Sequence, residues 1–98
     1  MDFELSENDF VKETVISANN IDFFGHTNNI EYVKLMYGTI PSNIIKNYRL
    51  KEFEIHYIKE SREQDTLKIF RRDENSRYLF EIKKDDITLC KAILKFEN

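Results

Sequence analysis

Hydrophobic and polar residues alternate along the second half of the chain in a way that predicts an antiparallel sheet. Phe53, Ile55 and Tyr57 alternate with polar neighbours, which is typical of a half-buried strand within residues 52–60. The same period of two recurs in three further segments that we expect to be strands: residues 66–71, 77–83 and 87–96. The side chains expected to point inward from these segments are Leu67, Ile69, Tyr78, Phe80, Ile82, Cys90, Ala92 and Leu94. The connections between these segments are short, and short connections favour antiparallel neighbours.

The first half of the chain predicts a strand followed by a helix. β-branched residues over residues 10–18 favour a strand, and a pair of asparagines then interrupts it. A helix is expected next, capped by Thr27 or Asn28. Its apolar residues follow helical spacing and should face a core: Ile30, Val33, Tyr37 and Ile40. Pro41 ends this helix or begins a short one over residues 42–48.

These elements predict an α+β domain, in which a five-stranded antiparallel sheet has one apolar face covered by a single helix. The 98 residues are enough for one domain, residues 1–98, and not for two. Residues 1–8 are polar and are expected to form a loose arm, or a short helix over Phe3 and Leu5. A domain of this size buries a thin core, so self-association into a homodimer or larger oligomer is expected to help it.

The charge balance disfavours a general nucleic-acid binder, since 15 basic and 18 acidic residues give a net charge of −3. Two basic pairs, Arg71-Arg72 and Lys83-Lys84, could meet phosphates or an acidic carrier protein, or could be solvated turn ends. No run approaches the roughly 20 apolar residues of a membrane span. Cys90 is the only cysteine, and with an N-terminus unlike a secretion signal it indicates a reducing, cytoplasmic compartment. Neither metal-ligand spacing nor a glycine-rich phosphate loop is present, so no metal or cofactor is expected.

The segment from Asp22 to Asn29 concentrates the candidate chemistry at the junction of strand and helix. Asp22 and His26 lie four residues apart across Gly25, whose backbone a ligand can approach closely. The amides of Gly25 and His26 could hold a developing oxyanion. A structural alternative stays open, in which Asp22 is a turn residue and His26 a partly buried residue at the helix start. In that alternative Asn28 and Asn29 are helix caps.

Glu60 is the second candidate acid. A carboxylate at the end of a strand could act as a base or orient a histidine, or could be an ordinary solvated residue. Ser61 follows it without the Gly-x-Ser-x-Gly surroundings of an activated nucleophile. His56 lies on the polar side of its strand and should be a surface or interface residue, whereas Cys90 alternates with apolar neighbours and should be buried.

Residues 21–32, Ile-Asp-Phe-Phe-Gly-His-Thr-Asn-Asn-Ile-Glu-Tyr, resemble the D-x-x-G-H-x-N-N-x-x-Y signature of hotdog-fold thioesterases. They are most similar to the acyl-ACP thioesterase and 4-hydroxybenzoyl-CoA thioesterase groups. A second stretch resembles the Y-x-x-E-(C)…D-x-L strand of acyl-ACP thioesterases: Tyr57-Ile58-Lys59-Glu60-Ser61 followed by Asp65-Thr66-Leu67. The two motifs occur in the expected order, and the predicted elements match one complete hotdog domain, whose sheet wraps around a central helix.

This resemblance implies hydrolysis of an acyl-ACP or acyl-CoA thioester to the free acid and the carrier thiol. It implies that Asp22 activates water or assists its attack, that His26 belongs to the same cluster, and that Glu60 is a further catalytic candidate. The residues that bind substrate and polarise the thioester carbonyl would lie at the helix start: Gly25, Asn28 and Asn29. Two subunits would pair their sheets edge to edge, with the site at the interface.

Two positions depart from the acyl-ACP thioesterase pattern. Phe24 stands where that group usually carries Asn, although Phe is familiar in the acyl-CoA type, and Ser61 stands where many plant members carry Cys. Such enzymes also commonly contain two hotdog halves, so this chain would have to dimerise or represent a single half. The alternative function is therefore a non-catalytic acyl-thioester-binding protein or a structural hotdog subunit. Acyl chain length and the choice between ACP and CoA stay open.

Overall fold

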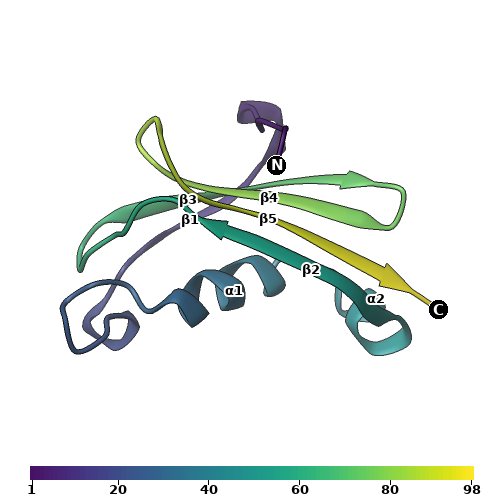
Figure 1. Cartoon of the computed structure of the whole chain (residues 1–98), viewed down its shortest axis with the longest axis horizontal. Helices are drawn as coiled ribbons and strands as arrows, with labels where there is room; N and C mark the ends of the chain where they lie inside the picture. Colours follow the sequence, from purple (N-terminus) through teal and green to yellow (C-terminus); the bar gives the residue numbers. More distant parts are fainter.

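The computed structural model describes residues 1–98 as a curved antiparallel sheet that lies across one central helix (Figure 1). The elements in chain order are η1 (Glu7–Asp9), β1 (Phe10–Val15), η2 (Ala18–Asn20), α1 (Asn29–Tyr37), α2 (Ser42–Asn47), β2 (Arg49–Tyr57), β3 (Thr66–Glu74), β4 (Arg77–Lys84) and β5 (Ile87–Glu97). The five strands are ordered β1-β3-β4-β5-β2, and every neighbouring pair is antiparallel. The predicted α+β class, with a sheet wrapped around a helix, is confirmed.

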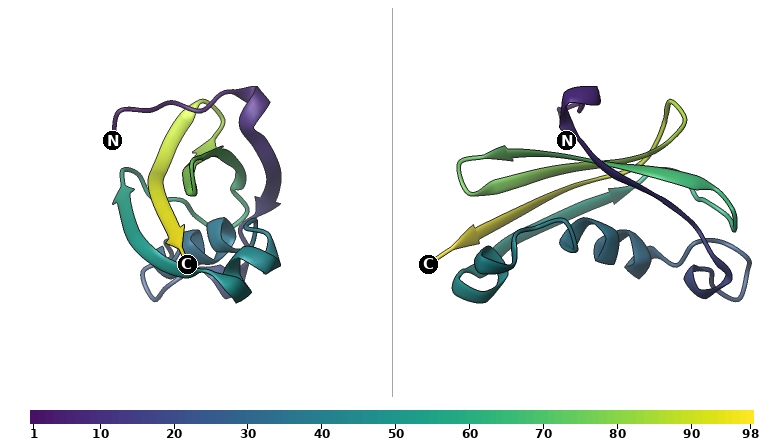
Figure 2. Two further views of the ribbon diagram at one scale, coloured as in Figure 1. Left: turned by 90° about the vertical axis from the view of Figure 1, so that its right-hand side faces the viewer. Right: turned by 180° about the vertical axis from the view of Figure 1, so that it is seen from behind.

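Helix α1 lies against the concave face of the sheet, and Figure 2 shows the strands curling around it. Tyr32 and Met36, one turn apart, are buried on the side that meets the sheet, and Ile40 is buried just beyond the helix end. The predicted apolar face was wrong at Ile30, which is 52% exposed. Ile30 precedes Tyr32 by two positions and therefore points about 200° away around the helix axis.

The core lies between α1 and the central strands β3, β4 and β5. Alternate residues of these strands point towards the helix, because successive side chains of a strand point to opposite faces. The residues predicted to point inward are all buried: Leu67, Ile69, Tyr78, Phe80, Ile82, Cys90, Ala92 and Leu94. Alternation along the sequence thus identified the face of the sheet that meets α1.

The strand boundaries differ from those expected by a few residues, and two of the differences affect the candidate site or a turn. Strand β2 ends at Tyr57, so Glu60 lies in the segment after the strand and not at its end. Strand β3 continues to Glu74, which leaves only Asn75 and Ser76 in the turn to β4. Both have positive φ, 46° and 70°, as in the two-residue hairpin turns whose twist matches that of the flanking strands.

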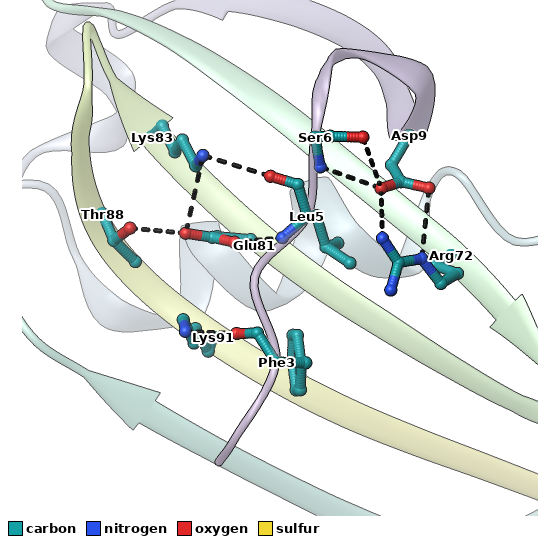
Figure 3. Close-up of polar contacts among 9 residues, drawn as sticks. All are labelled: Phe3, Leu5, Ser6, Asp9, Arg72, Glu81, Lys83, Thr88 and Lys91. Atoms are coloured by element: carbon teal, nitrogen blue, oxygen red, sulfur yellow. Dashed lines mark hydrogen bonds and ion pairs between the residues drawn. The ribbon is translucent and has the colours of Figure 1, made fainter.

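Residues 1–8 do not form a loose arm, so that prediction was wrong. The arm crosses the convex face of the sheet, on the side opposite α1 (Figure 3). Leu5 is only 3% exposed and packs with Phe70 of β3 and Leu79 of β4, while Phe3 lies at the edge of the same small cluster. The arm is ordered because these apolar side chains need cover on the outer face of the sheet.

Polar contacts hold the arm in place around Glu81, a carboxylate that is only 1% exposed. The Leu5 N–H donates to Glu81 Oε1 at 2.9 Å, and the Thr88 hydroxyl donates to Oε2. Lys83 and Lys91 donate to the carbonyl oxygens of Leu5 and Phe3, respectively (Figure 3). The arm therefore supplies a donor to a buried carboxylate, and buried polar groups are normally paired in this way.

Candidate active site

The segment from Asp22 to Thr27 is a tight turn that the Asp22 carboxylate holds together. Asp22 Oδ1 accepts the Phe24 N–H at 2.9 Å and the His26 N–H at 3.2 Å. The Gly25 N–H donates to the Asp22 carbonyl at 3.1 Å, and the Asp22 N–H donates to the His26 carbonyl at 2.7 Å. Gly25 has a φ of +84°, and a Cβ built there would meet no atom within 4 Å. The backbone conformation, and not a lack of space, is therefore the reason for glycine.

The Gly25 and His26 amides, which were expected to face a ligand, are hydrogen-bonded within the turn. The N–H groups of Gly25 and His26 both donate to Asp22 and are not available to an oxyanion. Phe23 and Phe24 project from the tip of the turn, where they are 97% and 78% exposed and pack edge to face on one another. Phe24 therefore does not fill the position at the centre of a site that its place in the motif suggested.

The two asparagines at the start of α1 play different parts. Asn28 is the N-cap, and its side chain accepts the Ile30 N–H at 3.1 Å, as the structural alternative predicted. Asn29 is the first residue of the helix, where N–H groups have no partner within the helix. Its N–H has no acceptor in the protein, while its carbonyl accepts the Tyr57 hydroxyl at 3.3 Å. Asn29 thus offers the free backbone donor that was expected from Gly25 and His26.

His26 and Glu60 meet, although they come from distant parts of the chain. His26 Nε2 lies 3.2 Å from Glu60 Oε2, with the histidine side chain 26% exposed and the glutamate 69% exposed. The segments that carry them run side by side, since the Thr27 N–H donates to the Ser61 carbonyl at 2.8 Å. Both residues were candidates from the sequence, and the structure brings them into one pair. Asp22 contacts the backbone of His26 and does not contact Glu60.

A cleft of about 230 Å³ opens beside this pair at the start of α1. Its lining combines Glu60 and the first helical residue with two tyrosines: Thr27, Asn29, Tyr32, Tyr57, Ile58, Lys59 and Glu60. A larger hollow of about 500 Å³ lies along β1, but charged residues line most of it and none of its lining residues belongs to either motif. The chemistry of the first cleft, with a carboxylate and a free backbone donor, makes it the candidate active site.

The structure adds three hydroxyl groups that the sequence analysis did not assign. Ser61 Oγ lies 2.6 Å from Thr27 Oγ1 and 2.6 Å from the Tyr32 hydroxyl, and all three residues are at most 5% exposed. Burial raises the pKa of Tyr32 and of Tyr57, so both phenols stay neutral at physiological pH. The only signal for these residues in the sequence was their position in the motifs. Tyr32 is the last residue of the first motif, and Ser61 is the last residue of the Tyr57–Ser61 stretch in the second.

The two basic pairs do not form a free basic patch. Arg71 pairs with Asp73 at 2.9 Å, Arg72 with Asp9 at 2.9 Å, and Lys84 with Asp65 at 2.9 Å; Lys83 lies 3.8 Å from Glu81. The Arg72 hydrogen bond lowers the pKa of Asp9 below its usual range, which keeps that carboxylate charged. Arg71 also donates to the carbonyl of Thr39, after α1, so all four side chains are engaged within the protein.

The remaining sequence features agree with their positions in the fold. Cys90 is buried, and burial raises the pKa of its thiol to about 12, so it is no nucleophile at neutral pH. His56 lies on the surface of β2, 3.0 Å from Glu54. No three His, Cys, Asp or Glu side chains cluster closely enough to hold a metal ion. None of the helices has the length and apolar character needed to span a membrane.

Solved thioesterase structures share this fold. An acyl-ACP thioesterase from Bacteroides thetaiotaomicron matches with a TM-score of 0.90 and 25% identity, over 99% of this chain and 41% of that one. The 12:0-ACP thioesterase from Umbellularia californica matches with a TM-score of 0.84 and 17% identity, over 97% and 38%. A probable thioesterase from Bartonella henselae matches with a TM-score of 0.72 and 13% identity, over 90% and 88%. The chain therefore spans about two fifths of the first two proteins. No curated protein matches the sequence.

The sheet that wraps around a central helix, which these structures share, defines a domain with the hotdog thioesterase fold. Residues 3–98 match the acyl-ACP thioesterase C-terminal domain, and the chain belongs to this family. The resemblance that the two motifs carried is confirmed.

Proposed function

We propose that this domain hydrolyses the thioester of an acyl group carried by ACP or CoA, with ACP as the first candidate carrier because of the family. One observation carries the proposal: His26 Nε2 meets Glu60 Oε2 at 3.2 Å at the edge of a cleft that is also lined by Asn29, whose N–H has no acceptor in the protein. A carboxylate, a histidine and a backbone donor are the groups that acyl transfer to water requires.

In this proposal Glu60 is the general base and His26 holds it in place by donating Nε2–H. A water molecule loses a proton to Glu60 while its oxygen bonds to the thioester carbonyl carbon. The oxyanion that forms accepts the Asn29 N–H at the start of α1. The C–S bond then breaks, and protonated Glu60 gives its proton to the leaving thiolate, which restores the carboxylate as the free acid leaves. Tyr57 fixes the Asn29 backbone through the bond to its carbonyl.

Asp22, expected to be the principal carboxylate, receives a positioning role in this scheme. Its Oδ1 accepts two N–H groups of its own turn and so fixes the backbone of His26. Gly25 allows that turn, and Asn28 caps the helix whose first residue, Asn29, lines the cleft. The sequence predicted that these residues belong to the site. We infer that they position its backbone and take no part in the chemical step.

A second hotdog unit is the proposed partner, either another copy of the chain or another part of a longer protein. Strand β2 is an edge strand, bonded only to β5, and unpaired edges invite further strands. Apolar side chains near this edge and the cleft stay exposed, at 44% for Phe53, 43% for Tyr57 and 53% for Ile58. A unit seated there would cover them and close the cleft. Sedimentation of wild type and of Phe53→Lys checks this, since a shift of the variant towards the monomer is expected.

The alternative is a domain that binds acyl thioesters without turning them over. Two observations favour it: Glu60 is 69% exposed, and Phe24 replaces the amide usual in the family. This alternative predicts saturable binding of an acyl-CoA or acyl-ACP with no release of thiol. The same assay therefore separates the two functions.

The test is thiol release from matched acyl-ACP and acyl-CoA substrates over a range of chain lengths. Glu60→Gln is expected to lower kcat about 100-fold or more, because a general base typically contributes 10² to 10⁴ in rate. Glu54→Gln is the matched control, since Glu54 forms a similar pair with His56 at 3.0 Å, away from the cleft. Equal activity of Glu60→Gln and Glu54→Gln would contradict the role of Glu60.

A further inference from the structure

Behind the His26–Glu60 pair, three buried hydroxyl groups form one connected chain. The Tyr32 hydroxyl lies 2.6 Å from Ser61 Oγ, Ser61 Oγ lies 2.6 Å from Thr27 Oγ1, and Thr27 Oγ1 donates to the Ser61 carbonyl at 3.1 Å. The residues are 2%, 1% and 5% exposed in the order Tyr32, Ser61 and Thr27. The central hydroxyl, that of Ser61, makes both of its hydrogen bonds within the protein.

The chain has one proton order that satisfies every contact. A carbonyl oxygen can only accept, so the Thr27 hydroxyl gives its single proton to Ser61 O. Thr27 Oγ1 must then accept the Ser61 proton, and Ser61 Oγ in turn accepts the Tyr32 proton. Each hydroxyl donates once, and none is left unpaired. The order runs from Tyr32 on helix α1 through Ser61 to Thr27, the last residue of the motif turn.

The three residues join the two segments that carry the candidate pair. Thr27 follows His26 directly, and Ser61 follows Glu60 directly. The Thr27 N–H and hydroxyl both donate to the Ser61 carbonyl. These two hydrogen bonds join the segments at the position next to the His26–Glu60 pair. Tyr32, buried against the sheet, anchors this tie to α1.

We propose that Thr27, Tyr32 and Ser61 form a hydroxyl clamp that sets the distance between His26 and Glu60, with Ser61 as its central positioning residue. The proposal rests on the proposed function for its effect on turnover. It also excludes Ser61 as a nucleophile, although Ser61 occupies a motif position next to the acid. Its oxygen is buried, its proton is committed to Thr27, and neither His26 nor Glu60 contacts it.

The test compares Tyr32→Phe and Ser61→Ala with Tyr78→Phe in the full chain. Tyr78 is a buried tyrosine on β4 whose hydroxyl makes no hydrogen bond, so Tyr78→Phe controls for loss of a buried phenol. Tyr32→Phe and Ser61→Ala are expected to lower kcat about tenfold with KM within about twofold, since small displacements of reacting groups cost rate more than binding. Tyr78→Phe is expected to match wild type.

Two further readouts need no substrate and so separate the clamp from the proposed function. Amide exchange at Thr27 should speed up about tenfold in both clamp variants, because its acceptor on Ser61 is no longer held. The imidazole ¹⁵N signals of His26 should move towards those of Glu60→Gln. If wild type releases no thiol, the proposed function fails while these two readouts still decide the clamp.

Wild-type values of Thr27 exchange and of the His26 signals in both clamp variants would overturn the proposal. So would an acyl group found on Ser61 by mass spectrometry after incubation with substrate, because the clamp requires that this oxygen does not react. Loss of kcat together with both spectroscopic changes supports it.

Discussion

At the residue scale, the Asp22 carboxylate shows how one side chain can hold a turn together. Two backbone N–H groups, those of Phe24 and His26, donate hydrogen bonds to a single oxygen of Asp22. This arrangement is an aspartate turn, in which the side chain replaces a backbone acceptor. The exposed aromatic tip of the turn follows from it, since the backbone bonds point inward and the side chains of Phe23 and Phe24 point out.

Substitutions of Asp22 separate a positioning role from a catalytic one. Asp22→Asn keeps an Oδ1 acceptor and is expected to retain activity within about threefold, whereas Asp22→Ala should lose about tenfold because the His26 backbone is released. Asp22→Ala should also lower the free energy of unfolding by about 1 kcal/mol, as for the loss of a cap. Thiol-release kinetics and urea denaturation measure both effects. An asparagine variant as inactive as the alanine variant would mean that Asp22 acts through its charge.

At the scale of elements, the N-terminal arm behaves as part of the sheet's outer layer. Leu5 closes the small cluster formed by Phe70 and Leu79, and the Leu5 N–H serves the buried Glu81. The arm is not a strand, because its backbone bonds go to side chains of β4 and β5 and not to a neighbouring ladder. Its docking therefore depends on a few specific groups.

Leu5→Ala tests how strongly the arm is held. Truncating a buried leucine typically costs 2 to 5 kcal/mol, and the shallow position of this cluster places the expected loss at about 2 kcal/mol. Glu4→Ala, at the exposed neighbouring position, is the control and should change stability by less than about 0.5 kcal/mol. Equal urea midpoints for the two variants would show that the arm contributes nothing to stability.

At the scale of the whole molecule, curvature lets one helix cover the concave face of five strands. The 14 residues of the main cluster come from α1, the segments beside it and strands β3 to β5, and Cys90 lies fully buried at their centre. Burying this thiol in an apolar core raises its pKa to about 12 from an ordinary value of 9.0. The burial of one group thereby links the stability of the whole fold to pH.

Alkaline unfolding follows from this shift. Above pH 9.0 the unfolded chain releases the Cys90 proton while the folded chain keeps it until about pH 12. The folded state then binds more protons, so the free energy of unfolding falls as pH rises through this window, by up to about 1.4 kcal/mol per pH unit. Urea titrations between pH 8 and pH 11 (roughly the range of the ordinary thiol) measure the slope. Cys90→Ala should flatten it, leaving a weaker fall from the phenols of Tyr32, Tyr57 and Tyr78, whose pKa values are also raised. An unchanged slope in this variant would refute the assignment.

Much of the fold could be predicted from local pattern, and the exceptions have physical causes. Alternation in β3, β4 and β5 identified the inward side chains because these central strands are paired on both sides and packed on α1. The same alternation failed to predict Glu81, which is buried on the opposite face by an arm that it could not place. The alternation also overestimated how deeply the apolar side chains of β2 are buried. That strand lies at an edge of the sheet and leaves Phe53 and Tyr57 more than 40% exposed.

The sequence by itself determined the order of elements, the glycine turn before α1 and the two motifs that indicate an acyl-ACP thioesterase domain. These features depend on backbone preference and on the period of side chains along a strand or helix, and both are local. Only the tertiary structure decided that His26 meets Glu60, that Asp22 is bound within its own turn, and that Asn29 presents the free N–H. These contacts join segments far apart in the chain, or depend on which acceptor each backbone N–H finds. They are therefore set by how the sheet curves around α1 and by how the segment after β2 pairs with the motif turn.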